Sequence, residues 1–295
     1  MKKLTILGLM LALLQAQGDH TSAHSEPDPT IDLRAMSFNI RNGKAKDGEN
    51  RWELRKNLAC EVIRDFAPDV LGIQEAYDFQ LDELKTQLPQ YGQVGLGRDP
   101  GSKGEHSSIL YRKDKFKVEE SETFWLSDTP SKPSRTWGHF YRRVCTWARF
   151  TEKESNQSFY VFNTHMDHKS QEAREKGAQL IMQRIRDRKH PDPFILTGDF
   201  NAGEDNPVIA YLKGTGELED ANPIPLVDSW RAMHPDEEEV GTFTRFTGNI
   251  DGPKIDYIFV TPATEVKEAN IDLVNRDGRY PSDHFPVTAV VELKL

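Results

Sequence analysis

Histidine and carboxylate residues follow the ends of several apolar, strand-like runs in this sequence of 295 residues. The run that begins at residue 158 leads to His165, and the run that begins at residue 193 leads to Asp199 and Asn201. Histidine can move a proton near neutral pH, and carboxylates can orient a histidine or bind a cation. A lone residue of this type usually forms a turn or a hydrogen bond in the core. Six such endings in one chain are hard to explain as turns, because turn formation does not require histidine or glutamate.

The strand-end residues that could serve this chemistry are Asn39, Glu75, Asn163, His165, Asp167, Asp199, Asn201, Asp256, Asp283 and His284. Glu75 continues the apolar face of Leu71 and Ile73, where a carboxylate is costly to bury unless a cation pairs with it. Asp283 and His284 stand directly before the last strand-like run. A phosphoester suits these groups, because a divalent cation can offset its negative oxygens while a histidine accepts the proton of a water molecule.

Eight strand-like runs and two amphipathic helices are expected to position these residues. The strands are predicted at residues 31–40, 68–76, 107–113, 145–150, 158–166, 193–200, 254–261 and 287–293. The helices are predicted at residues 51–66, with an apolar stripe of Leu54, Leu58, Val62 and Phe66, and at residues 171–188. Because most strands follow one another without an intervening helix, the pattern favours a single α+β domain of packed sheets flanked by helices.

The first residues have the three-part pattern of a secretory signal peptide. Lys2 and Lys3 precede an apolar run over residues 4–14, and Ala16 offers a small residue for cleavage. We expect a signal peptide over 1–18, a flexible polar segment over 19–30 and a folded domain over 31–295. The protein is then exported, to the periplasm or the extracellular space. No later apolar run of the sequence is long enough to span a membrane.

The net charge bears on the possible substrates, and the two cysteines bear on disulfide formation. The net charge is −9 with both signs evenly mixed, and an acidic protein does not attract long polyanions through its overall field. This disfavours a nuclease that acts on duplex DNA. The two cysteines, Cys60 and Cys145, fall in an expected helix and an expected strand among apolar residues, so we expect two buried free thiols.

Six short motifs, in order along the chain, resemble those of the endonuclease/exonuclease/phosphatase superfamily. They are "MSFNIR", "DVLGIQE", "NTHMD", "GDFN", "KIDYIF" and "SDHFP", and the resemblance runs from about residue 33 to residue 294. It implies a deoxyribonuclease I-like fold, a two-sheet β-sandwich with helices outside, in four α/β/β/α layers. The local pattern "MDHKSQEAREKG" resembles bacterial relatives of the deadenylase-like branch. The implied activity is metal-dependent hydrolysis of phosphoesters.

The resemblance also implies roles for individual residues. The metal-site positions are matched by Glu75, Asn39 and Asp283, whose oxygen atoms suit Mg²⁺ or Mn²⁺. The positions that contact the scissile phosphate and the attacking water are matched by Asp199 and Asn201. His284 matches the base or transition-state stabiliser, with Asp256 orienting its ring, and His165 matches the histidine that binds phosphate or assists the leaving group.

Substrate contacts are expected from residues near these motifs, namely Arg41, Glu105, Arg143, Asn163, Asp167, His168 and Arg174. Glu105 or His106 stands where nucleases of the superfamily often carry a tyrosine, which also disfavours recognition of duplex DNA. Trp125 and Trp137 fit a core position and a substrate wall equally well.

The sequence therefore favours an exported, monomeric phosphodiesterase or nuclease that hydrolyses single-stranded nucleic acid or small phosphodiesters. Two alternative enzymes are a phospholipase C or sphingomyelinase and a phosphatase of sugar or inositol phosphates. A non-catalytic binding module with a vestigial site is an alternative of another class. The complete set of metal and histidine positions disfavours it, because a vestigial site is expected to have lost at least one of them.

Overall fold

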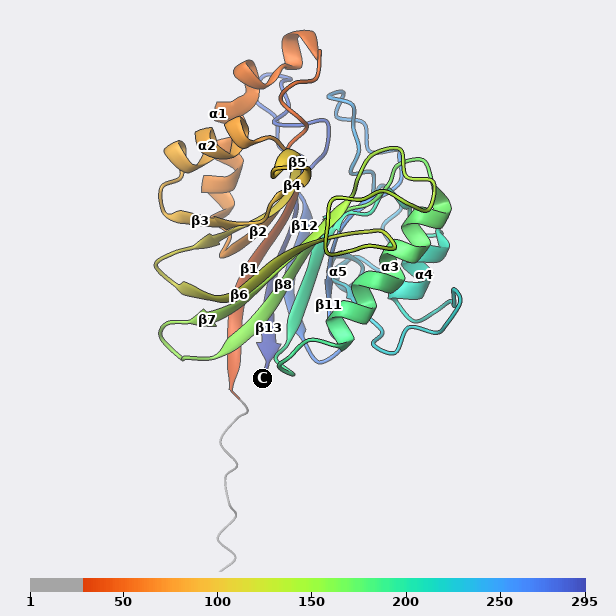
Figure 1. Cartoon of the computed structure of the whole chain (residues 1–295). Helices are drawn as coiled ribbons and strands as arrows, with labels where there is room; N and C mark the ends of the chain where they lie inside the picture. Colours follow the sequence, from red (N-terminus) through yellow and green to blue (C-terminus); the bar gives the residue numbers. More distant parts are fainter. Residues whose placement is uncertain (1–28) are drawn as a thin grey trace, which may run out of the picture.

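The computed structural model describes residues 29–295, so the predicted signal peptide and most of the polar segment after it lie outside the described residues. Within that described range, no helix is long and apolar enough to cross a membrane. The strands form two sheets that face each other (Figure 1).

The first sheet has the strand order β12-β13-β1-β2-β5-β3, with β4 paired to β5. Its strands are β1 (Thr30–Asn39), β2 (Val70–Ala76), β3 (Tyr91–Val94), β4 (Gly97–Asp99), β5 (Lys103–Arg112), β12 (Glu265–Ile271) and β13 (Val287–Lys294). The second sheet has the order β10-β11-β9-β8-β7-β6. Its strands are β6 (Phe116–Trp125), β7 (Val144–Glu152), β8 (Ser158–His165), β9 (Phe194–Asp199), β10 (Val227–Asp228) and β11 (Asp256–Val260).

Helices cover the outer face of each sheet. They are α1 (Trp52–Phe66), α2 (Asp78–Gln87), α3 (Gln171–Arg186) and α4 (Pro207–Leu212). Helix α5 (Ser229–Met233) instead contacts β12 of the first sheet and β10 and β11 of the second, and a short 3-10 turn spans Gly48–Asn50. Apolar residues of α1 and α2 pack on β1, β2 and β5, and those of α3 and α4 pack on the second sheet. A third apolar cluster lies between the sheets. The predicted four-layer sandwich is therefore confirmed (Figure 1).

The first predicted helix forms, but its buried stripe differs from the expected one. Leu58 and Val62 are buried, whereas Leu54 is 39% exposed. A spacing of four residues advances about 40° beyond a full turn, so three such steps rotate the stripe by about 120°. The buried face of α1 instead contains Ala59 and Ile63 beside Leu58 and Val62.

Several short or polar elements were not predicted from the sequence, namely β3, β4, β6, β10, β12, α2, α4 and α5. Strand β6 shows the reason. Its sequence "FKVEESETFW" is rich in glutamate, and its middle residues alternate between exposed and half-buried. An edge strand of this kind lacks the apolar run that marks an inner strand. Both cysteines are buried and free, as predicted.

Strand register brings the chemically active residues to one end of the sandwich. Strands β8 and β9 are parallel, with His165 opposite Asp199, and β11 is antiparallel to β9, with Asp256 opposite the same Asp199. In the other sheet, β1 and β2 are parallel and end near Asn39 and Glu75. The segment that enters β13 lies at the same end, because the first residue of β13 pairs with a residue near the end of β1.

Glu75 reaches this end through a β-bulge, a feature absent from the simple alternation that we expected. Its φ is 65°, and the register of β2 against β5 shifts between Gln74 and Ala76. Leu71 and Ile73 face the helices α1 and α2, and Ala76 belongs to the same apolar cluster. Because a bulge re-aims a side chain, Glu75 leaves that helix-covered face and lines the site.

Candidate active site

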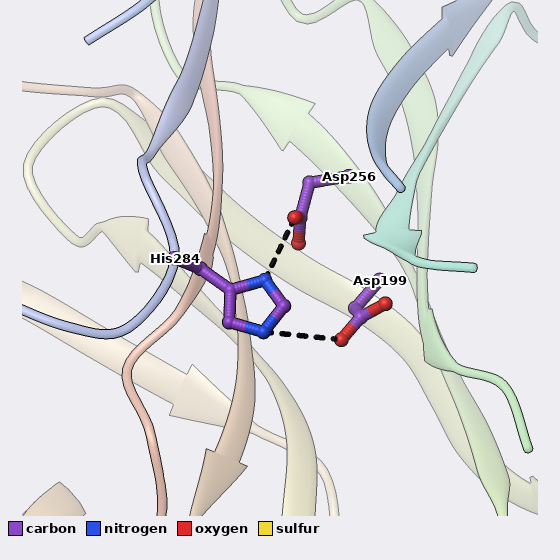
Figure 2. Close-up of side chains that lie close together, drawn as sticks. All are labelled: Asp199, Asp256 and His284. Carbon is purple, nitrogen blue, oxygen red and sulfur yellow. Dashed lines mark hydrogen bonds and ion pairs between the residues drawn. The ribbon is translucent and has the colours of Figure 1, made fainter. Parts of the chain in front are cut away.

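A histidine and two aspartates form the buried centre of the site (Figure 2). His284 Nδ1 lies 2.8 Å from Asp256 Oδ2, and His284 Nε2 lies 3.9 Å from Asp199 Oδ2. Burial lowers the pKa of His284, but the charges of Asp256 and Asp199 outweigh it and raise the pKa to about 10. The geometry thus orients the ring, with Nδ1 facing Asp256 and Nε2 facing Asp199, and the two carboxylates favour its protonated form.

Asp199 is the hub between the two sheets. Its Oδ2 accepts a hydrogen bond of 2.9 Å from Asn39 Nδ2, and its Oδ1 accepts one of 2.9 Å from the backbone N–H of Asn201. His165 Nε2 lies 3.4 Å from Asp199 Oδ2. Burial, followed by the negative charge of Asp256, raises the pKa of Asp199 to about 7. A carboxylate with this pKa can accept or return a proton near neutral pH.

Beside this centre, the side-chain oxygen atoms of three residues lie in one corner of the site, which is formed by Asn39, Glu75 and Asp283. Glu75 accepts hydrogen bonds from Asn39 Nδ2, at 3.2 Å, and from the backbone N–H of Asn42, at 2.9 Å. Asp283 lies 3.6 Å from the guanidinium of Arg41. Burial and the negative charge of Glu75 raise the pKa of Asp283, although His284 and Arg41 act in the opposite direction.

This corner fits a hard divalent cation. The negative charge of Glu75 raises the proton affinity of the buried Asp283, so the corner has negative charge that a cation would neutralise. Asp199, Asp256 and His284 also bring their ligand atoms within 4.8 Å of one another. However, the hydrogen bond between His284 and Asp256 already uses two of those atoms. Glu75, Asn39 and Asp283 are therefore the better candidate ligands for Mg²⁺ or Mn²⁺, with Asp199 next to them.

A cavity of about 490 Å³ opens over these residues. Its lining includes the predicted residues Arg41, Glu75, Glu105, Arg143, His165, His168, Asp199, Asn201, Asp283 and His284. Arg143 is 4% exposed and donates to His168 Nδ1 at 3.2 Å. Burial and the charge of Arg143 lower the pKa of His165 well below its usual value. His165 is therefore neutral near pH 7 and can act as a hydrogen-bond partner.

The structure places three predicted substrate residues outside the cavity lining, where they hold the scaffold. Asn163 lies between the sheets and donates to the carbonyl oxygens of Ile73 and Ser108. Asp167 is fully buried and accepts hydrogen bonds from backbone N–H groups, and Arg174 donates to the carbonyl oxygen of Asp167. Their contacts fix the strand and the loops that carry His165 and His168.

The two tryptophans weighed as a substrate wall are also scaffold residues. Trp125 donates through its indole N–H to the carbonyl oxygen of Arg98, and Trp137 donates to Asp128. The aromatic residues in the cavity lining are instead Tyr77, Tyr141 and Phe243.

Two arginines at the site, Arg55 and Arg98, were not predicted from the sequence. Arg55 is buried in α1 and donates to the carbonyl oxygens of Ile40, Arg41 and Pro281, so it holds the segment before Asp283 against β1. Arg98 lines the cavity and pairs with Glu105. Two features of the sequence could have indicated them. Arg55 is a charged residue within the apolar stripe of a helix, and Arg98 lies in the glycine-rich run "GLGRDPG".

A two-sheet sandwich with a buried histidine–carboxylate centre at one end defines the architecture of a class of phosphoester hydrolases. The chain belongs to the endonuclease/exonuclease/phosphatase family, whose model matches residues 36–284.

Similar proteins include two bacterial proteins of solved structure and a eukaryotic relative. A family member from Bacteroides thetaiotaomicron is 33% identical with a TM-score of 0.81, covering 91% of this chain and 98% of that one. A mannosyl-6-phosphatase from Bacteroides thetaiotaomicron is 34% identical with a TM-score of 0.77, covering 88% and 99%. Nocturnin from Drosophila melanogaster is 26% identical over 91% of this chain, and the match spans 48% of Nocturnin.

Proposed function

We propose that the protein is a divalent-metal-dependent hydrolase of small phosphoesters. The observation that carries the proposal is the His284–Asp256 pair, which faces Asp199 in the cavity that Glu75 and Asp283 also line. A divalent ion held by Glu75, Asn39 and Asp283 would offset the charge of the phosphoryl oxygens and stabilise the leaving alkoxide.

Residues of the chain itself would provide proton transfer and charge stabilisation. Asp199, held by Asn39 and Asn201, orients a water molecule and accepts its proton. The imidazolium of His284, which Asp256 keeps charged and oriented, stabilises the negative charge that develops on the phosphoryl group. Neutral His165 binds a phosphoryl oxygen or assists the leaving group. This arrangement favours His284 as stabiliser over His284 as base.

Two observations support a compact substrate. A cavity of about 490 Å³ is within the range of small-molecule sites. The bacterial relative at 34% identity is a mannosyl-6-phosphatase, which favours a phosphomonoester of a small alcohol over the diester favoured by the sequence alone. A second candidate substrate is the end of a single-stranded nucleic acid, supported by the match to an RNA exonuclease from Saccharomyces cerevisiae, which is 26% identical over 52% of this chain.

The test is hydrolysis of a panel of phosphomonoesters and phosphodiesters with Mg²⁺ or Mn²⁺. Wild-type protein is expected to release phosphate from small esters, and His284→Ala is expected to lose most of that turnover. His190→Ala removes a histidine outside the site and serves as the matched control. If His284→Ala and His190→Ala retain equal activity, the site does not perform the reaction.

We also propose that the chain is exported and acts as a monomer. Support for export comes from the basic and apolar pattern of residues 2–14 and the small residue Ala16. Mass spectrometry of protein recovered from outside the cytoplasm should show an N-terminus that begins directly after Ala16 or a few residues later. Intact Met1 in that material would contradict cleavage.

A further inference from the structure

A polar wall beside His165 has no part in the hydrolytic chemistry described above. The wall consists of Arg98, Glu105 and Arg143. Together with the catalytic His165 they line one small void of about 10 Å³. All four also line the active-site cavity. The wall is therefore adjacent to His165, the residue that we propose assists the leaving group.

An ion pair forms the centre of this wall. The guanidinium of Arg98 lies 2.6 Å from Glu105 Oε2, and Arg98 is only 7% exposed. The same guanidinium lies 4.7 Å from the ring centroid of Tyr141. Tyr141 is 46% exposed and stacks on His168 with ring centroids 6.1 Å apart. A half-exposed tyrosine thus covers a nearly buried ion pair at the edge of the cavity.

The backbone holds the ion pair in a fixed position. The indole N–H of Trp125 donates to the carbonyl oxygen of Arg98 at 2.7 Å. Gly104, directly before Glu105, has a φ of +83°, and a Cβ there would lie 2.5 Å from Asp99 Oδ2. Asp99 in turn pairs with Arg142 at 3.0 Å. Because these contacts hold Arg98, Asp99 and Gly104 next to the turn of the β4–β5 hairpin, the wall is organised before a ligand binds.

The chemistry of the wall matches a ligand with several hydroxyl groups. A carboxylate accepts and a guanidinium only donates, whereas a hydroxyl does both and can bridge them. Nucleobase binding relies on a free aromatic face for stacking. The ring of Tyr141 already contacts Arg98 and His168, which leaves its hydroxyl and edge for polar contacts.

We propose that Arg98, Glu105 and Tyr141 form the leaving-group subsite and select a phosphorylated sugar, an inference that rests on the proposed phosphoesterase function. Their hydrogen bonds to sugar hydroxyls discriminate the substrate, while the groups around His284 and Asp199 cleave the phosphoester. Arg98 and Glu105 are specificity residues for the alcohol half of the substrate.

The test compares kcat/KM for a hexose 6-phosphate and for p-nitrophenyl phosphate, which has the same phosphoryl group but no sugar hydroxyls. In Glu105→Gln, the ratio of the two values is expected to fall at least about ten-fold, because buried polar groups of the site lose hydrogen bonds to the sugar. The change should appear mainly in KM for the hexose phosphate. Glu265→Gln, on the exposed side of edge strand β12, is the matched control.

Tyr141→Phe provides a second variant, because its side chain is half-exposed and its ring contacts with Arg98 and His168 are kept. It should also lower the ratio, by a smaller factor, and it carries the test if Glu105→Gln fails to fold in a thermal unfolding assay. An unchanged ratio in the folded variants overturns the proposed subsite. So does a wild-type preference for a nucleoside 5′-monophosphate over the hexose phosphate. Hydrolysis of none of these esters by wild-type protein instead overturns the proposed function.

Discussion

His284 Nδ1 and Asp256 Oδ2, 2.8 Å apart, join the two sheets of the sandwich at the active-site end. Asp256 begins β11 in the second sheet, and His284 lies in the segment that enters β13 in the first. The hydrogen bond therefore depends on the packing of one sheet against the other. It couples the orientation of the imidazole ring to the assembly of the whole domain.

The first prediction concerns this pair. His284→Ala should lower kcat by about 10²–10⁴, because an acid–base or charge-stabilising group is removed. Asp256→Asn should give part of that loss. It should also lower the pKa of His284 from about 10, because the negative charge of Asp256, which stabilises the protonated ring, is removed. Steady-state kinetics and an NMR titration of the histidine ring measure both effects. An unchanged pKa of His284 in Asp256→Asn would contradict the assigned contact.

The second prediction concerns the candidate metal corner. Mn²⁺ should raise the melting temperature of the wild-type protein, because a ligand that binds only the folded state stabilises it. Glu75→Gln should reduce this rise. Burial raises the pKa of Glu75, but the charge of His284 and the hydrogen bond from Asn42 outweigh it and lower the pKa, so the substitution should also lower the melting temperature without metal slightly. Glu53→Gln, an exposed position on α1, is the matched control. Full hydrolytic activity in excess chelator would exclude the metal-dependent mechanism.

The third prediction concerns acid stability and Asp167. Burial raises the pKa of this carboxyl. The contact with His139, whose Nδ1 lies 3.5 Å from Asp167 Oδ2, and hydrogen bonds from the backbone N–H groups of Ser170 and Lys169 outweigh burial and hold the pKa well below its usual range. A depressed folded-state pKa contributes stability that is present above the unfolded pKa of about 3.9 and is lost as the pH falls below it.

Asp167→Asn should therefore lower the free energy of unfolding at pH 7 by about 1.5–3 kcal/mol, the loss of hydrogen bonds to a charged group. The loss should be smaller at pH 3. Urea unfolding at both pH values measures it, with the exposed Asp236→Asn as control. Equal losses at pH 3 and pH 7 would show that the charge of Asp167 is not responsible.

The fourth prediction concerns substrate size. Small phosphoesters and short single strands should be hydrolysed better than plasmid DNA at equal phosphate concentration, because the chain has a net charge of −9 and duplex binding requires many phosphate contacts. Activity on the small esters should change little between two salt concentrations. Preferential nicking of plasmid that collapses at high salt would reveal a duplex-binding surface.

Local pattern was sufficient to predict the inner strands and the residues that end them. Alternation with a period of two placed His165, Asp199 and Asp256 on the apolar faces of their own strands, and the family motifs implied that these strand ends converge. The four-layer sandwich was implied by the motifs and confirmed by the sheet order. Charged edge strands such as β6 were missed, because partial solvent exposure leaves no apolar run to find.

The sequence by itself determined which residue types meet at the site, whereas the tertiary structure decided which of them face the cavity. A bulge at Glu75 turned its carboxylate away from the helices. Asn163 does not reach the cavity, because its side chain forms hydrogen bonds with Gln74 and Thr197 between the sheets. Arg98 joined the site because β4 folds back on β5 and brings it to Glu105. The physical reason is that a side chain is oriented by hydrogen-bond partners from distant segments, and a local pattern contains no information about those partners.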